Sequence, residues 1–121
     1  MIELTEATTE TTAGGRCAPG LAPRIDTAAA QALSDDLSIL GHPVRLQILD
    51  MLAQRDGQVC VCDLEGALPV KQPTVSHHLK LLREAGLIDA ERRGLWAYYF
   101  VKRENLAAMR ARILGALDAV C

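Results

Sequence analysis

Two of the four cysteines stand two residues apart, Cys60 and Cys62, in the apolar stretch VCVCDLEGAL. Cysteine thiolates bind soft metal and metalloid ions and undergo redox chemistry, whereas a buried thiol can also be a small apolar side chain of the core. In a regular helix, residues i and i+2 point about 200° apart, so both thiols reach one ion only where the start of the helix is unwound or extended. The pair is a candidate ligand set. The secondary structure around it determines whether the thiols bind an ion, undergo redox chemistry or pack in the core.

Composition and length restrict the class of protein. The chain has 121 residues, enough for one domain, and its hydrophobic fraction of 50% with only 3% aromatic residues predicts an aliphatic core. The acidic, polar start, MIELTEATTETTAGG, does not resemble a signal peptide, and no run reaches the ~20 apolar residues of a membrane span. We therefore expect a cytoplasmic protein with mostly reduced cysteines, in which disulfides are the less expected use.

The signals for helices and turns give an order of elements. Residues 1–25 are rich in Thr, Gly and Pro and predict a flexible arm that carries Cys17, followed by one domain over 26–121. Caps, stops and apolar periodicity predict helices over 26–41, 43–57, 60–68, 73–86 and 104–120, and strand-like runs over 87–91 and 95–101. The runs flank RRG, where Gly94 permits a hairpin turn. Helix, turn, helix and hairpin in this order predict a mainly α fold of the winged helix-turn-helix type.

Charge is distributed unevenly along the chain. Residues 71–103 contain seven Lys or Arg against three Asp or Glu, whereas residues 1–70 contain four against ten. A local basic zone on an acidic protein indicates an anionic partner, and a helix with a polar face suits the major groove of DNA. His78 is expected beside the core, because neighbouring helix residues point about 100° apart. The candidate DNA contacts are Gln72, Ser76 and His77 for bases, and Thr74, Lys80, Arg83, Arg92 and Arg93 for phosphates or an adjacent groove.

Four segments together resemble successive landmarks of the ArsR/SmtB family of winged helix-turn-helix repressors. They are LSILGHPVRLQILDML, VCVCDLEGAL, KQPTVSHHLKLLREAGLI and RRGLWAYYFV, and the resemblance covers about residues 33–118. It implies a homodimer joined through the first and last helices, in which the apo dimer represses an operon at operator DNA, expected to be an inverted repeat. It also implies that ligand binding releases the DNA, and VCVCDL is similar to the branch that senses toxic metals and metalloids, including repressors of arsenical resistance.

Two departures from that branch bear on the ligand. Many arsenite-sensing relatives have a third cysteine where this chain has Glu65, and the last helix, ENLAAMRARILGALDAVC, lacks the histidines of the zinc site found in others. As(III) and Sb(III) favour three thiolates, so we expect Cys60, Cys62 and Cys17 as ligands, with Cys17 from the same subunit or its partner and Cys121 not involved. Ligand binding would then distort the start of the helix over 60–68 and tilt the next helix off the DNA.

Three alternatives stay open. The same cysteines suit a sensor of Cd, Pb or Zn, or a thiol-redox switch. A small thiol oxidoreductase is disfavoured, because the spacing is CxC rather than CxxC and no βαβ unit is expected. We therefore expect no enzyme and no constitutive cofactor.

Overall fold

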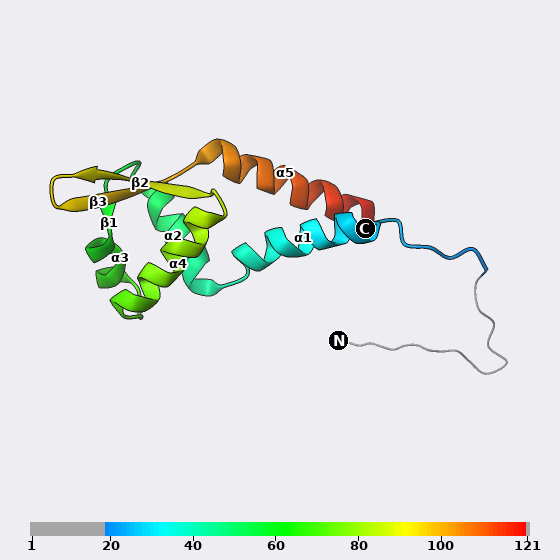
Figure 1. The fold of residues 1–121 in the computed structure, drawn as a ribbon, viewed down its shortest axis with the longest axis horizontal. Helices are drawn as coiled ribbons and strands as arrows, with labels where there is room; N and C mark the ends of the chain where they lie inside the picture. Colours follow the sequence, from blue (N-terminus) through cyan, green and yellow to red (C-terminus); the bar gives the residue numbers. More distant parts are fainter. Residues whose placement is uncertain (1–18, 121) are drawn as a thin grey trace.

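The computed structural model describes residues 19–120 and contains five helices and one three-stranded antiparallel sheet (Figure 1). The predicted order of helices and hairpin is confirmed, and the fold is a mainly α winged helix-turn-helix. In chain order, the elements are α1 (Thr27–Leu40), α2 (Pro43–Gln54), β1 (Val59–Cys60), α3 (Val61–Ala67), α4 (Gln72–Glu84), β2 (Ile88–Arg93), β3 (Trp96–Val101) and α5 (Arg103–Val120).

The junction between α1 and α2 follows from local sequence. Asp26 caps α1, as predicted, because its carboxylate accepts a hydrogen bond of 2.8 Å from the N–H of Ala29. A Cβ atom at Gly41 would lie 2.9 Å from the carbonyl oxygen of Leu37, so glycine permits the close end of α1. His42 then caps α2, and Pro43 occupies its first turn. The chain therefore changes direction sharply within three residues.

The core lies among α2, α3, α4 and the sheet. On α4, Val75, Leu79 and Leu82 are buried, as their spacing predicts, and His78 is also buried, with 5% of its surface exposed. The remaining core residues are Val44, Ile48, Leu49, Leu52, Val59, Leu64, Leu68, Leu87, Ile88, Val101, Met109 and Ile113. This aliphatic core fixes α4 against the sheet.

Strand β1 was not predicted. It contains only Val59 and Cys60, which pair with Tyr99 and Tyr98 of β3, so the sheet order is β1-β3-β2. Two residues are too few for the period-2 pattern that identifies a strand. The predicted helix over 60–68 is therefore wrong at its start: Cys60 is extended backbone, and α3 begins at Val61.

The wing, which is the β2–β3 hairpin, also differs from prediction at its tip. Arg92 and Arg93 belong to β2, and Arg93 pairs with Trp96, so only Gly94 and Leu95 form the turn. Gly94 has φ of 64°, the left-handed conformation expected of a glycine there. The two arginines therefore lie on a regular strand beside the tip rather than in the turn.

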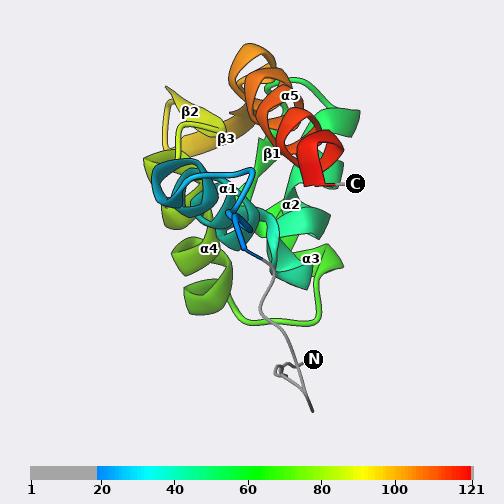
Figure 2. The same ribbon diagram turned by 90° about the vertical axis from the view of Figure 1, so that its right-hand side faces the viewer.

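Helices α1 and α5 extend side by side away from the rest of the molecule (Figure 1), and Figure 2 views this pair end on. Arg112 of α5 donates to both carboxylate oxygens of Asp36 of α1, at 3.0 and 3.2 Å. No residue of α1 is buried, and the predicted apolar stripe of α5 is buried only at Met109 and Ile113. Four large apolar side chains of this pair are exposed: Leu37, Leu114, Leu117 and Val120.

Among the described residues, no helix is both long and apolar enough to cross a membrane.

Candidate functional site

The six candidate DNA contacts of α4 are all exposed: Gln72, Thr74, Ser76, His77, Lys80 and Arg83. The buried residues of the helix lie on its opposite side. Ser76, Lys80 and Arg83 also line a groove of about 400 Å³ whose far wall includes Tyr99 of the wing. Leu79 and Glu84 complete the groove, and its hydroxyl, ammonium and guanidinium groups can hold a segment of phosphate backbone while the start of the helix reaches base edges.

Two cations among the candidate DNA contacts, Arg83 and Arg93, form ion pairs with neighbouring carboxylates. Arg83 donates to Asp89 at 3.1 Å, and a hydrogen bond from the N–H of Ala90, followed by the charge of Arg83, lowers the pKa of Asp89. Arg93 donates to Glu91 at 3.1 Å and its guanidinium carbon lies 4.9 Å from the centre of the Tyr98 ring. These side chains are exposed, so the pairs add little stability and can exchange for phosphate.

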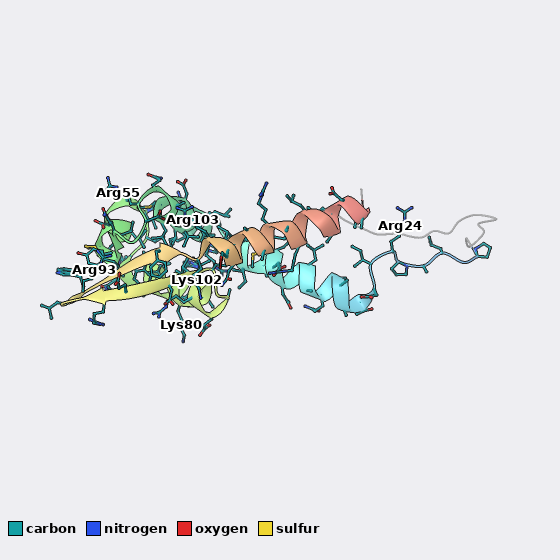
Figure 3. The ribbon with its side chains drawn as sticks, turned by 90° about the horizontal axis from the view of Figure 1, so that it is seen from above. Arg24, Arg55, Lys80, Arg93, Lys102 and Arg103 are labelled. Atoms are coloured by element: carbon teal, nitrogen blue, oxygen red, sulfur yellow. A yellow bond between two sulfur atoms is a disulfide. The ribbon has the colours of Figure 1, made fainter. Side chains whose placement is uncertain are left out.

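The two wing arginines point to opposite faces of the sheet, because neighbouring residues of a strand alternate. A Cβ atom placed at Gly57, in the turn before β1, would lie 3.5 Å from a guanidinium nitrogen of Arg93. Figure 3 shows Arg93 on that side of the wing and Lys80 on the side of α4. Arg92, on the other face, is therefore the wing arginine on the same side as the α4 surface.

Cys60 and Cys62 lie at the junction of β1 and α3. Their Cα atoms are 5.4 Å apart and their sulfur atoms are paired as a disulfide. The sulfurs meet because Cys60 is extended, with φ of −97° and ψ of 169°, while Cys62 lies in the first turn of α3. This corrects the expected distortion of the helix: the thiols already converge, and no helical turn has to unwind. Cys60 is buried and Cys62 is exposed.

Asp63 joins the two cysteines. Its Oδ2 atom accepts a hydrogen bond of 3.0 Å from the N–H of Cys60 and lies 3.4 Å from the Sγ atom of Cys60, the distance of a hydrogen bond from the reduced thiol. Ligand atoms of Cys60, Cys62 and Asp63 all lie within 4.8 Å of one another, and we call these three residues the thiol cluster. Sequence reasoning missed Asp63, although an acidic residue three positions after a helix cap is a known capping signal.

A pocket of about 260 Å³ connects the thiol cluster to both DNA-binding elements. Cys60, Cys62 and Glu65 form one wall, Gln72 at the start of α4 forms another, and Leu95, Trp96 and Ala97 of the wing complete it. A ligand at the thiols would therefore contact the elements that carry the candidate DNA contacts. The other two cysteines, Cys17 and Cys121, lie outside the described residues.

Comparison with known proteins matches residues 42–90 to the family of bacterial regulatory proteins called the arsR family. An uncharacterised helix-turn-helix transcriptional regulator of Methanocaldococcus jannaschii is 44% identical over 50% of this chain and 67% of its own length. An arsenic resistance transcriptional regulator of Pseudomonas putida is 41% identical over 59% of this chain and 56% of its own length. A cadmium resistance regulator of Listeria innocua is 35% identical over 69% and 68%. The matches thus span between just over half and about two thirds of these relatives.

Solved structures agree. A possible transcriptional regulator for arsenical resistance is similar with a TM-score of 0.58 and 31% identity, over 64% of this chain and 78% of that one. The homodimeric winged helix-turn-helix domain of a possible ArsR-family regulator from Mycobacterium bovis is similar with a TM-score of 0.56 and 31% identity, over 84% and 91%. The fold, the exposed polar face of α4 and these similarities lead to one assignment. The chain belongs to the ArsR family, whose members are DNA-binding transcriptional regulators rather than enzymes, and it is a transcriptional repressor of that family.

Proposed function

We propose that this protein represses transcription as an apo dimer bound to an inverted-repeat operator, and that As(III) or Sb(III) releases it by binding cysteine thiolates. The observation that carries the proposal is the convergence of Cys60 and Cys62 beside Gln72 and the wing. Similarity to regulators of arsenic resistance supports the choice of ligand. A repressor of this kind works in the cytoplasm, where DNA is present and thiols stay reduced.

The dimer would form through α1 and α5, which leave four large apolar side chains exposed in one subunit. Each subunit would place its α4 in the major groove, with Gln72, Ser76 and His77 at base edges. Thr74, Lys80, Arg83 and Arg92 would hold phosphates on the side of α4, with the pair of Arg83 and Asp89 opening on binding, and Arg93 would reach the DNA backbone only from the opposite face of the wing. These contacts release counterions, so affinity falls steeply with salt.

Cys17 would supply the third sulfur. Among the described residues, the thiol cluster offers two sulfur atoms and one carboxylate oxygen, whereas a soft trivalent centre prefers three sulfurs. Cys17 lies nine residues before Asp26, and an extended chain of that length reaches up to ~30 Å. The arm of one subunit could therefore deliver Cys17 to its own thiol cluster or to its partner's.

Release from DNA would follow because the thiols share one pocket with the start of α4 and the wing. Ligand at the thiols would fill the pocket that Cys62 and Glu65 share with Gln72 and Trp96, and so would change how α4 and the wing lie relative to each other. Both elements must fit one operator half-site at once, and two half-sites lie about 34–36 Å apart, so a small rearrangement is amplified across the dimer. This route replaces the helix distortion expected from the sequence.

A thiol-redox switch is the second candidate, because the sulfurs of Cys60 and Cys62 are already paired in this structure. Oxidation by a peroxide would convert two thiols into one disulfide. The two thiols lose two protons and two electrons, and hydrogen peroxide becomes two molecules of water. Closing the disulfide removes the S–H donor that Cys60 offers to Asp63, whose Oδ2 atom lies 3.4 Å from the sulfur, and joins the two cysteines that line the pocket.

A sensor of Cd, Pb or Zn is the third candidate. The carboxylate of Asp63 beside the two sulfurs gives a mixed sulfur and oxygen set that these divalent ions accept. Similarity to a cadmium resistance regulator also supports it. As(III) bound to three thiolates would leave Asp63 to its capping hydrogen bond, so the role of Asp63 distinguishes the two ligand classes.

One titration separates these candidates. An operator is selected from random inverted repeats, and bound protein is titrated under reducing conditions with arsenite, antimonite, Cd²⁺, Pb²⁺ and Zn²⁺, and without reductant with hydrogen peroxide followed by dithiothreitol. Trp96, the only tryptophan, lies in the pocket and reports ligand binding by its emission. We expect arsenite and antimonite to release DNA at the lowest concentrations, with a parallel change in emission. Release by peroxide alone, reversed by dithiothreitol, would favour the redox switch, and release by none of these reagents would refute the proposal.

A further inference from the structure

Arg45 of α2 lies where three helices meet. Its Nη1 group donates to the carbonyl oxygens of Ser38 and Ile39 at the end of α1, at 3.0 and 3.2 Å. Its Nε group donates to Nδ1 of His78, which is buried in the middle of α4, at 3.1 Å. One guanidinium thus links the helix that projects from the molecule to the helix with the candidate DNA contacts.

The link matters because it is the contact that ties the end of α1 to α4, whereas the Arg112–Asp36 pair ties α1 to α5. No residue of α1 is buried, and the chain bends through Gly41 directly after it. The last carbonyl groups of a helix lack partners within the helix, and a cation near them is favourable. Arg45 therefore provides both the missing donors of α1 and a fixed contact across the bend.

The geometry also requires uncharged histidines. His78 accepts through Nδ1, so its proton must be on Nε2. His42 accepts through Nδ1 from the N–H of Val44 at 3.1 Å, and its ring centre lies 4.2 Å from that of His78. We call Arg45, His42 and His78 the hinge cluster. A guanidinium bound to Nδ1 of His78 makes this a poor place for a metal ion.

The charges around His78 all act in one direction. Burial is the main cause that lowers the pKa of His78, followed by His42 and Arg45 from α2 and by His77 from α4. Helix α1 contributes only the two carbonyl oxygens bound to Arg45. No acidic group contributes to the shift, so protonation of His78 would add a cation to a site that already holds one.

We propose that Arg45 is a positioning residue for DNA binding: by joining the end of α1 to neutral His78, it sets the direction of α4 relative to the dimerisation helices and hence the spacing of the two α4 helices on DNA. The proposal rests on the dimer proposed above and is independent of the thiol ligand. Loss of the link, or protonation of His78, would leave each subunit folded but misplace the two α4 helices. DNA binding would then become less selective for half-site spacing and weaker in acid.

The test compares Arg45→Met with Arg55→Met, an exposed arginine directly after the same helix, as the matched control. Both are measured on the selected operator and on versions with one or two base pairs added or removed between half-sites. We expect Arg45→Met to remain dimeric, to bind the operator at least about ten-fold more weakly, and to lose most of the preference for spacing, because hydrogen bonds from a charged group are strong. The control should match wild type. Unchanged affinity and unchanged spacing preference in Arg45→Met would overturn the proposal.

A second pair of variants keeps the proposal testable if Arg45→Met does not fold. His78→Asn keeps a hydrogen-bond acceptor near the position of Nδ1 but has no group that titrates. His78→Leu has neither an acceptor nor a group that titrates. Between about pH 7.5 and pH 5.5, wild-type affinity should fall relative to His78→Asn, since the two proteins differ only in the titratable group at residue 78. His78→Asn should match wild type at the higher pH and His78→Leu should not. Identical pH profiles for wild type and His78→Asn would refute the role of neutral His78. Release by arsenite is measured in parallel, so failure of the thiol proposal would be seen separately.

Discussion

The thiol cluster at the start of α3, which shares a pocket with the start of α4, and the hinge cluster behind the middle of α4 are built in opposite ways. Cys62 and Asp63 are exposed, Cys62 lines the pocket shared with α4 and the wing, and once the disulfide is reduced the cluster can bind a ligand. His78 is buried, and its Nδ1 atom and the guanidinium of Arg45 are already engaged in hydrogen bonds. Both clusters adjoin the same helix, so the contrast separates the part that can change from the part that must stay constant.

The difference is useful for a regulator. A helix that is released by a ligand needs one contact that the ligand can rearrange, and this contact has to be reachable from solvent. The same helix must also return to one position when the ligand leaves, which requires a contact that solvent and ligand do not reach. The hydrogen bond from Arg45 to His78 is partly buried, with the His78 ring inside the molecule, and is therefore the stronger constraint.

The largest expected effect comes from the thiol cluster. Cys60→Ser and Cys62→Ser should each abolish release by arsenite while changing operator affinity by less than about two-fold, because neither residue lies among the candidate DNA contacts. Operator binding with and without arsenite checks this by fluorescence anisotropy. A variant that still releases DNA at the wild-type arsenite concentration would move the sensing site elsewhere and break the comparison.

Replacement of Cys17 should have a smaller effect. Cys17→Ser should raise the arsenite concentration needed for release by about ten-fold, equivalent to about 1.4 kcal/mol of binding free energy. X-ray absorption should count three sulfur neighbours around arsenic in wild type and two in Cys17→Ser, and Cys121→Ser should match wild type. Three sulfurs in Cys17→Ser would instead make Cys121 the third ligand.

Asp63 tests whether the thiol cluster also has a structural role. Asp63→Asn removes the charge but keeps an acceptor, whereas Asp63→Ala removes the capping hydrogen bond to Cys60 and should lower the free energy of unfolding by about 1 kcal/mol. Urea denaturation of the reduced proteins measures the difference. If Asp63→Asn weakens release by Cd²⁺ but not by arsenite, the oxygen serves divalent ions only. An equal loss for both ions would place Asp63 in the arsenite site as well.

The smallest effect concerns pH and the hinge cluster. Because the pKa of His78 is lowered in the folded protein, the unfolded chain binds more protons between that pKa and the ordinary value of about 6.5. The free energy of unfolding should therefore fall as pH drops through this window and level off below it. Urea midpoints should show a shallower fall for His78→Asn than for wild type, while Cys62→Ser should keep the wild-type fall. If the free energy of unfolding of His78→Asn falls with pH as steeply as that of wild type, the pH effect comes from another group.

The comparison also shows what could be predicted from the sequence. The apolar spacing on α4 gave Val75, Leu79 and Leu82 as buried and His78 as their neighbour, because a helix repeats its faces at fixed intervals. The position of Cys60 could not be obtained in this way. It depends on pairing with Tyr98, which is distant in sequence, and a two-residue strand carries no periodicity.

Polar partners were harder to predict than burial. Nothing in the local sequence around Arg45 indicates that its side chain reaches both α1 and α4, since His78 is 33 residues away. Asp63 was within reach of a sequence argument, because its position relative to Cys60 matches a capping pattern. The roles of Cys60, Cys62 and the candidate DNA contacts remain predictions that the experiments above test.

Helix α1, which buries no side chain within one subunit, has a consequence for gene dosage. An element that gains further packing from a second copy becomes more stable by mass action, so its order depends on the number of molecules present. In a cell with few copies, a fraction of the repressor would be monomeric and poor at holding a two-sided operator. The level of its own expression would then set how completely the operon is silenced before any inducer arrives. Comparing operator occupancy over a dilution series with subunit association by sedimentation would show whether the two midpoints coincide.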